Sequence, residues 1–412
     1  MSTLPPDSWR NRPSHRQWLT EQANGLFAFF QNRMINPRGG FFDLDVAGKP
    51  IAPNNPVRGI HSTGRMVHCY AIGSLLGRPG SDIVVDHGMQ YLWNVHRDTE
   101  RGGYYWAVDD NGASDNGRKQ GYGHAFVMLA ASSAKLVGHP LADRMLADVT
   151  EVIGTRFWEE QNGAIAEEFN GDWSPISTYH GQNSNMHLTE ALMAAFEATG
   201  DRSYLDKAER IADLIIRRRA GENGYRVAEH FDGNWAVDKN YLGDPMFRPP
   251  GTTPGHWLEW SRLILQLWVL GGKRHDWMPE AGEALFAQSV ALGWDNALGG
   301  FFYTLDWNDV PDTRGKYWWP MCEGAAAAAF LVEHRPSAFH ETWYRRIWDV
   351  IARYFIDEKN GGWNEQLTED MIPSYTLFKG KGDIYHALQA CMIPLYPAKG
   401  SLTRGVVEAM KG

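Results

Sequence analysis

A short segment that opens with glycine recurs six times along this chain, about once every 60 residues. The last glycines of these openings are Gly40, Gly103, Gly163, Gly224, Gly300 and Gly362. The successive intervals are 63, 60, 61, 76 and 62 residues. Self-similarity at a fixed period indicates a repeat architecture, in which each unit buries its apolar face against its neighbours.

Two helical patterns separate each glycine-led segment from the next. The first is apolar nearly all round, as in "AAAAAFLVEH" at residues 325–334, which predicts burial on every side. The second is amphipathic, as in residues 203–219, with apolar residues at three and four spacing and charges on the opposite face. The first set should therefore form an inner ring and the second an outer ring exposed to water.

We predict an all-α fold, an (α/α)6 barrel of six helix pairs with short β-hairpin-like segments at one end. The whole chain, residues 1–412, should form a single catalytic domain. An open superhelix of helix pairs is the alternative. Six units, and termini that run straight into repeats, favour closure.

Composition, net charge and the absence of long apolar runs exclude several classes of protein. A net charge of −9 without a basic block argues against nucleic acid or a membrane surface as partner. No apolar run approaches the ~20 residues of a membrane span, and the first residues lack a signal-peptide core. The three cysteines, Cys69, Cys322 and Cys391, have unrelated spacings, which encode neither a disulfide framework nor a zinc cluster. We therefore expect a cytoplasmic protein; a homo-oligomer is compatible with the sequence.

The N-termini of the inner helices should gather at one mouth of the barrel, where polar residues interrupt the apolar pattern. Those residues are Arg65, His124, His187, His256, Glu323 and His386. The longest repeat interval contains "GDPMFRPPGTTPGH", an insertion that should build a loop over the same mouth. We predict a pocket there, with residues 245–255 as a candidate lid.

Three of the inner helices repeat a finer pattern, a histidine followed three residues later by Glu190, Glu259 or Gln389. Residues three apart share one helix face, and a helix N-terminus favours neutral imidazole, which can act as a base. One such histidine is most simply a structural residue. Three at equivalent repeat positions favour a catalytic site.

The polar residues at the mouth fit metal binding, glycoside hydrolysis and simple sugar binding less well. Three histidines and a glutamate could bind zinc, but no paired-ligand spacing such as H-E-x-x-H occurs, so we expect neither a metal nor another cofactor. A glycoside hydrolase needs two carboxylates, which Glu259 and Glu323 could supply on this mouth rich in histidine. A sugar-binding or interaction protein would keep the aromatic residues without needing aligned histidines.

Several segments together resemble the N-acylglucosamine 2-epimerase superfamily along nearly the whole chain. They are "PGHWLEW" (254–260), "KYWWPMCEG" (316–324) and "KGDIYHALQA" (381–390), with "RMV" and "NMHLTEA" upstream. Gln389 stands where the epimerase branches tend to carry arginine, so the chain is more similar to the aldose–ketose isomerase branch, which acts on mannose or sulfoquinovose. The resemblance implies a monosaccharide substrate, and acid/base catalysis by His256 and His386 without metal. It ties His187 to opening of the sugar ring.

These assignments define an expected mechanism. His386 should move a proton between C2 and C1 of the sugar through a cis-enediol or enediolate, interconverting D-mannose and D-fructose. His256 should shuttle protons at the oxygens, and Glu259 should orient His256. Sulfoquinovose isomerisation and sugar 2-epimerisation are the alternatives within the family. The expected substrate-binding residues are Arg58, Tyr122, Asn183, Trp319, Glu323 and Gln366.

Overall fold

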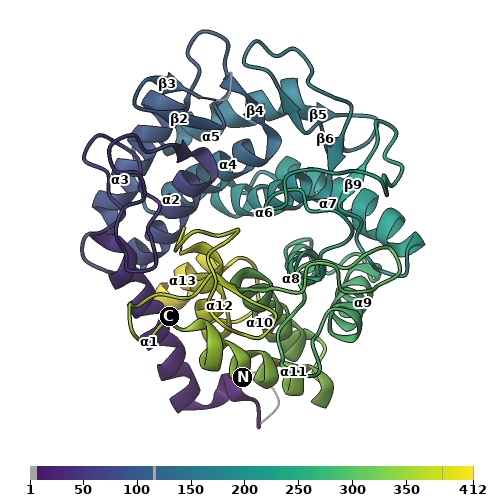
Figure 1. Cartoon of the computed structure of the whole chain (residues 1–412). Helices are drawn as coiled ribbons and strands as arrows, with labels where there is room; N and C mark the ends of the chain where they lie inside the picture. The colour runs from purple at the N-terminus through teal and green to yellow at the C-terminus, as the bar shows by residue number, and fades with distance from the viewer. Residues whose placement is uncertain (1–6, 115–116, 383, 412) are drawn as a thin grey trace.

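Six inner helices form a closed ring in the computed structural model, which describes residues 7–114, 117–382 and 384–411. Each inner helix contacts the next, and the last, α12, contacts the first, α2 (Figure 1). The predicted closure into an (α/α)6 barrel is therefore confirmed. The inner helices are α2 (Ile60–Leu75), α4 (Gly121–Leu136), α6 (Gln182–Thr199), α8 (Pro254–Leu270), α10 (Trp318–His334) and α12 (Tyr385–Met392).

The outer ring follows the amphipathic pattern. Its helices are α1 (Pro13–Gln31), α3 (Ser81–Tyr91), α5 (Ala142–Val152), α7 (Arg202–Ala212), α9 (Trp277–Leu292) and α11 (Ala338–Val350). Four of them end in π-helical segments, η2 (Leu92–His96), η4 (Ile153–Phe157), η5 (Asp213–Ala220) and η6 (Ile351–Phe355).

The two ends of the chain complete the ring. Helix α1 precedes the first glycine-led segment yet packs against α12, so it serves as the outer partner of the last inner helix. The C-terminal α13 (Leu402–Lys411) contacts α2. Short 3-10 turns, η1 (Trp9–Asn11) and η7 (Ile393–Leu395), flank this seam. Among the described residues, no helix combines the length and apolar character that crossing a membrane requires.

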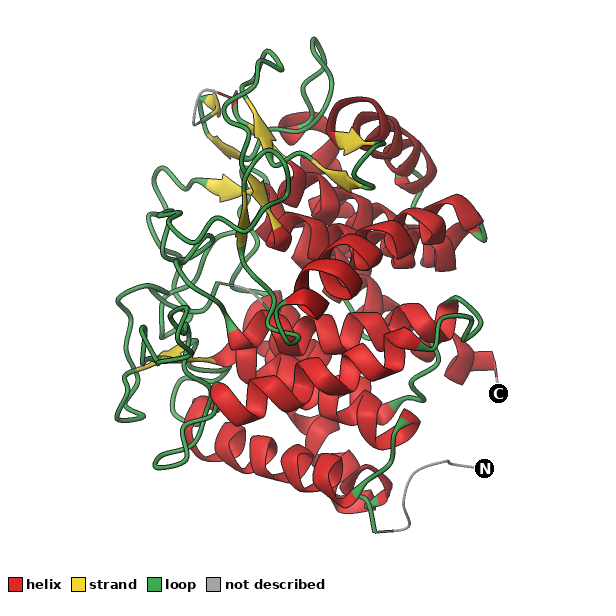
Figure 2. Cartoon of the chain, turned by 90° about the vertical axis from the view of Figure 1, so that its right-hand side faces the viewer, coloured by secondary structure: helices red, strands yellow, loops and turns green. Residues whose placement is uncertain are grey.

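Short strands and long loops cover the end of the barrel at which the inner helices begin (Figure 2). Among the described strands, β2–β3 and β5–β6 are hairpins, and isolated antiparallel bridges such as Ile35–Phe41, Trp294–Phe301 and Ile356–Trp363 close similar turns in other units. The pairs β1–β2, β4–β7, β8–β9 and β10–β11 join one repeat unit to the next. The predicted short hairpin-like segments at one end are therefore confirmed. The strands are β1 (Arg58–Gly59), β2 (Ala107–Asp109), β3 (Gly112–Ala113), β4 (Lys119–Gln120), β5 (Trp158–Glu159), β6 (Ala164–Ile165), β7 (Glu168–Phe169), β8 (His180–Gly181), β9 (His230–Phe231), β10 (Lys316–Tyr317) and β11 (Gln366–Leu367).

The repeat glycines mark one turn that every unit needs. All six have a positive φ, between 62° and 81°, a region that glycine enters without the steric cost of a Cβ atom. The turn brings the chain back from an outer helix toward the start of the next inner helix.

A buried ion pair holds several of these turns. In the second unit, Lys119 Nζ lies 2.8 Å from Asp98 Oδ2, and both side chains are buried. Asp98 Oδ1 also accepts backbone hydrogen bonds from Glu100 and Arg101 within the turn. Two further units repeat the device with the pairs Lys316–Asp295 and Lys381–Asp357, and another unit has the more exposed pair His180–Glu159.

Removing one partner should therefore destabilise the barrel. Lys119→Met leaves the Asp98 carboxylate buried without its cation, which we expect to cost about 3–5 kcal/mol of unfolding free energy. Urea denaturation of the purified variant measures the loss. Arg404→Met, which cuts the surface pair Arg404–Glu408, is the matched control and should cost less than about 1 kcal/mol. Equal losses in the two variants would contradict the structural role of Lys119.

His124, one of the polar residues predicted at the mouth, is a structural residue. Its Nε2 accepts a hydrogen bond from Tyr104 N at 3.0 Å, and its Nδ1 donates to Gln120 O at 2.7 Å. Burial lowers the pKa of His124 to about 4. The imidazole is therefore neutral, as its accepting Nε2 requires, and it ties the glycine turn of the second unit to α4.

This burial predicts a pH dependence of stability. Between pH 6.5 and about 4 the unfolded chain binds a proton at His124 that the folded protein does not. The free energy of unfolding should therefore fall as pH decreases through this window. His124→Gln should make the dependence shallower, and denaturation at pH 7.5 and 5.5 measures it. An unchanged slope would show that His124 does not titrate as the structure indicates.

Candidate active site

All six inner helices contribute side chains to one small cavity at the mouth. The helices supply Arg65, Tyr122, Asn183, His187, His256, Glu259, Trp318, Trp319 and His386, and the covering loops supply Met246, Phe247 and Phe378. The free volume is about 60 Å³, well below the ~300–1,000 Å³ of typical ligand pockets. Met246 and Phe247 come from the predicted loop over the mouth, so the structure places that loop across the cavity; its motion as a lid stays a prediction.

His256 is oriented by a carboxylate from the glycine-led segment of its own unit. Its Nδ1 lies 2.9 Å from both oxygens of Glu229, which also accepts a hydrogen bond from Gln182 Nε2 at 2.9 Å. Burial opposes ionisation of Glu229, but His256 and Gln182 outweigh it and lower the pKa of this carboxyl. An ionised Glu229 can only accept, so Nδ1 of His256 carries the proton. The expectation that Glu259 orients His256 is therefore wrong.

His386 is held in the same manner. Its Nδ1 lies 2.9 Å from Glu323 Oε1, and the other oxygen of Glu323 accepts from Arg262 Nε at 2.8 Å. Burial raises the pKa of Glu323, but Arg262 and His386 outweigh it and bring the net value below the usual range. Glu323, expected as a substrate-binding residue, does not line the cavity and instead positions His386.

Trp319 lies against both histidines. Its ring centroid is 4.8 Å from that of His256 and 6.0 Å from that of His386. The indole thus fixes the two imidazoles on one side of the cavity while it presents an apolar surface to a ligand, a geometry that suits a sugar ring.

His187 lies deeper, beside two carboxyl groups. Its Nδ1 is 3.8 Å from Glu190 Oε2 and 3.8 Å from Glu259 Oε1. Burial lowers the pKa of His187 to about 4, although Glu190 acts in the opposite direction. His187 is therefore neutral at physiological pH and able to accept or donate a proton.

Two groups of side chains bring donor atoms within 4.8 Å of one another, as a metal site would: His187 with Glu190 and Glu259, and Glu259 with Glu323 and His386. The guanidinium of Arg262 already sits among these carboxyl groups. A divalent cation would have to displace that buried ion pair, so the donor set is poorly suited to metal. The absence of a metal stays a prediction.

The arginine that faces the cavity is Arg65. Its Nη2 donates to Tyr122 OH at 2.9 Å, and its guanidinium lies over the Phe126 and Tyr385 rings. Tyr122 lines the cavity, as expected.

Arg58 was expected at this place, but it does not line the cavity. It pairs with Asp110 and donates to Tyr91 OH and Pro56 O. Arg58 belongs to strand β1 and has Asp110 as a structural partner, so its assignment to substrate binding is corrected.

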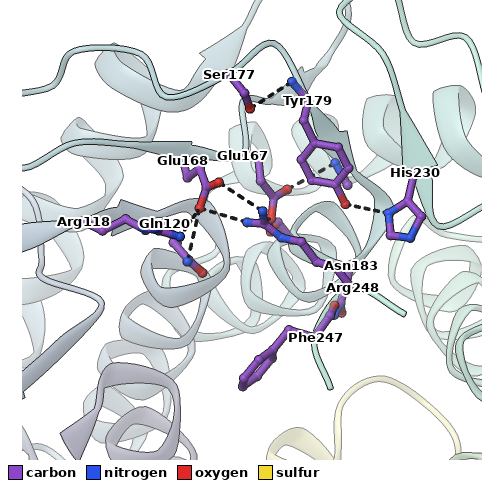
Figure 3. Close-up of polar contacts among 12 residues, drawn as sticks. Arg118, Gln120, Glu167, Glu168, Ser177, Tyr179, Asn183, His230, Phe247 and Arg248 are labelled. Atoms are coloured by element: carbon purple, nitrogen blue, oxygen red, sulfur yellow. Dashed lines mark hydrogen bonds and ion pairs between the residues drawn. The ribbon is translucent and has the colours of Figure 1, made fainter. Parts of the chain in front are cut away.

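A polar cluster fastens the covering loop at one side (Figure 3). Arg248 of the loop pairs with Glu168 at 3.0 Å and with Glu167 at 3.3 Å. Asn183 Nδ2, at the cavity wall, reaches the backbone oxygen of Phe247 at 3.4 Å. Asn183 therefore lines the cavity, as expected, and also contacts its cover.

Gln366 holds a second covering segment, residues 376–378, without lining the cavity itself. Its Oε1 accepts from the backbone N–H groups of Leu377 and Phe378, and its Nε2 donates to Thr376 Oγ1. Phe378 lines the cavity but Gln366 does not. The expectation that Gln366 binds substrate directly is thus corrected to a role in shaping the loop.

The sequence analysis missed Glu229 and Arg262, although the repeat carries a signal for the first. The segments "AEEF", "AEHF" and "NEQL" align Glu167, Glu229 and Glu365 directly before β7, β9 and β11. Their backbone oxygens accept from the first residues of three inner helices, at Gly121, Gln182 and Trp318. A glutamate at one repeated place beside the helix N-termini could therefore have been identified.

Comparison with known proteins places this architecture. The model of the N-acylglucosamine 2-epimerase family matches residues 39–390. A D-mannose isomerase of Pseudomonas cannabina pv. alisalensis is 40% identical over 404 residues, 96% of each chain. A cellobiose 2-epimerase of Dictyoglomus turgidum is 23% identical over 85% of this chain and 90% of its own. A crystal structure of D-mannose isomerase superimposes with a TM-score of 0.86 at 30% identity, covering 93% of this chain and 99% of that chain. The chain therefore belongs to the N-acylglucosamine 2-epimerase family.

Proposed function

We propose that this protein is an aldose–ketose isomerase that interconverts D-mannose and D-fructose through a cis-enediol or enediolate without a metal. The observation that carries the proposal is the pair His256 and His386, each bonded through Nδ1 to a buried carboxylate and both set against Trp319. With Nδ1 protonated, proton exchange with a substrate falls to Nε2. Two aligned bases on one small cavity suit proton transfer between adjacent sugar carbons.

In this mechanism His386 removes the proton at C2 and returns it at C1. His256 exchanges protons with the sugar oxygens, and neutral His187 assists opening of the ring. Arg65 and Tyr122 are placed to donate hydrogen bonds to the oxygen that becomes negative, a contribution worth roughly 10²–10³ in rate per donor. Trp319 provides the surface on which the sugar rests.

The cover of the cavity favours a monosaccharide over a disaccharide. Met246, Phe247 and Phe378 close the cavity above the histidines, so a disaccharide would require a larger displacement of the covering loops than a monosaccharide. The D-mannose isomerase identity of 40%, against 23% for the cellobiose 2-epimerase, points the same way. Sulfoquinovose is the second substrate to test, because Arg65 could face its sulfonate.

The deciding experiment is incubation of purified, chelator-treated protein with D-mannose in D2O, followed by NMR. We expect fructose that carries solvent deuterium at C1. Glucose without fructose would mean a 2-epimerase instead, and release of a sugar from a glycoside would mean a hydrolase. If mannose does not react, formation of sulfofructose from sulfoquinovose would move the substrate to a sulfonated aldose.

His386→Ala tests the base directly. The variant removes the group that moves the C2 proton, so we expect turnover to fall below detection. Circular dichroism and the melting temperature establish that the barrel remains folded. Substantial turnover by a folded His386→Ala variant would contradict the assignment of His386 as the catalytic base.

Glu229→Gln tests the tautomer of His256. The amide can donate as well as accept, so it no longer fixes the Nδ1 proton of His256, and we expect kcat to fall by about 10²–10⁴. Glu369→Gln changes an exposed carboxylate that contacts Arg314 rather than a histidine. It serves as the control and should leave kcat within about tenfold of the wild type. Equal losses in both variants would argue against a specific role for Glu229.

A further inference from the structure

Three buried carboxyl groups surround one buried guanidinium beneath the cavity. The Arg262 nitrogens lie 2.8 Å from Glu323, 3.3 Å from Glu190 and 3.7 Å from Glu259. All four side chains are at most 7% exposed. Such a cluster is stable only if its charges balance, because an unpaired buried charge costs several kcal/mol.

Glu190 and Glu323 have the contacts of ionised carboxylates. Glu190 accepts from Tyr385 OH and from Arg262 Nη1. Glu323 accepts from Arg262 Nε and from His386 Nδ1. Charge-assisted hydrogen bonds of this kind stabilise the ionised form.

Glu259 differs from both. Its Oε1 has no hydrogen-bond partner among the described residues; Arg262 Nη2 lies 3.7 Å away and Nδ1 of the neutral His187 lies 3.8 Å away. The side chain is only 1% exposed, yet it lines the cavity. Glu259 is thus the carboxyl group of the cluster that is directed at the ligand site without a strong partner.

Charge balance assigns the proton. Glu259 is faced from five helices by charged or titratable groups, namely Arg65 (α2), His187 and Glu190 (α6), Arg262 (α8), Glu323 (α10), and Tyr385 and His386 (α12). His68 (α2) acts on Glu190 and Arg262 of the same cluster. His68 and His187 are neutral, because burial lowers the pKa of each to about 4. The Arg262 guanidinium already pairs with Glu190 and Glu323, so an ionised Glu259 would be a third carboxylate around one guanidinium. The favourable effect of Arg65 on that charge is smaller than the cost of burial. Burial and repulsion from Glu323 raise its pKa well above the ordinary value.

We propose that Glu259 is a catalytic residue that is held as a neutral acid and donates a hydrogen bond to the substrate oxygen on which negative charge develops. This role rests on the proposed isomerase function. When the C2 proton leaves for the base, the electron pair moves through the new C1–C2 double bond onto the carbonyl oxygen. The neutral carboxyl group stabilises that oxyanion and keeps its own proton when C1 is protonated. An ionised carboxylate at the same place would repel the enediolate.

Matched substitutions test the role. Glutamine is neutral, nearly isosteric and still a donor, so Glu259→Gln should lose no more than about tenfold in kcat, whereas Glu259→Ala should lose about 10²–10³. Glu323→Gln, which replaces an ionised partner of His386, should be far more damaging than Glu259→Gln. If Glu259→Gln is as impaired as Glu259→Ala while both remain folded, Glu259 acts as a carboxylate and the proposal is overturned.

Infrared spectroscopy tests the protonation state without any turnover. At pH 7 the wild-type minus Glu259→Gln difference spectrum should contain the C=O stretch of a protonated carboxyl group, shifted in D2O. The subtraction also removes the signal of Glu197, another buried carboxyl, whose pKa burial raises to about 7. A carboxylate band in its place would overturn the proposal. If the band is present but the protein has no isomerase activity, Glu259 is a neutral acid and the proposed isomerase function is wrong.

Discussion

The parallel closure of the inner helices is the constraint on which the rest of the structure depends. Each inner helix contacts the next and α12 contacts α2, and residues near the start of every inner helix line one cavity, so all six helices begin at the same mouth. The first turns of every unit therefore converge on one small space. Residues separated by more than 300 positions, such as Arg65 and His386, line the same cavity for this reason. Small residues deeper in the ring, such as Ala325–Ala329, allow the helices to pack closely.

The convergence of the helix starts brings many ionisable side chains together out of water, and these side chains stabilise one another by pairing. Carboxyl groups, arginines and histidines lie out of water at the centre of the ring, where an unpaired charge is costly. Arg262 compensates Glu190 and Glu323, and Glu229 and Glu323 each fix the tautomer of one histidine. The same pairings that make burial tolerable also prepare the imidazoles for proton transfer. Stability and chemistry are therefore not separable at this site.

The end of the barrel around the cavity is assembled between units rather than within them. Strand pairs such as β4–β7 and β8–β9 link one unit to the next. Glu229, beside β9, bonds His256 of its own unit and accepts from Gln182 of the preceding unit. The loop of the longest repeat interval lies over the cavity through Phe247 and is fastened by Arg248 to Glu167 and Glu168. The covering loop and the glutamates that fasten it therefore belong to different units, and access to the histidines depends on the contacts between them.

The sequence by itself determined the six-fold repeat, the closed barrel and the mouth at which polar residues collect. Periodic glycines and helix patterns report on local backbone and burial, which each unit encodes alone. Position near the start of an inner helix was enough to place His187, His256 and His386 at the cavity, although His124, chosen by the same reasoning, is a structural residue.

Only the tertiary structure decided which groups pair with one another. Glu259 lies three residues after His256 on the same helix, yet Glu229 from another segment bonds the imidazole because it approaches at the level of the ring, whereas Glu259 lies one turn deeper, near Arg262. Arg58, which was expected at the cavity, is paired with Asp110 instead. Arg65 is the arginine that lines the cavity. Hydrogen-bond partners depend on side-chain direction and on neighbouring units, and no spacing within one helix encodes either.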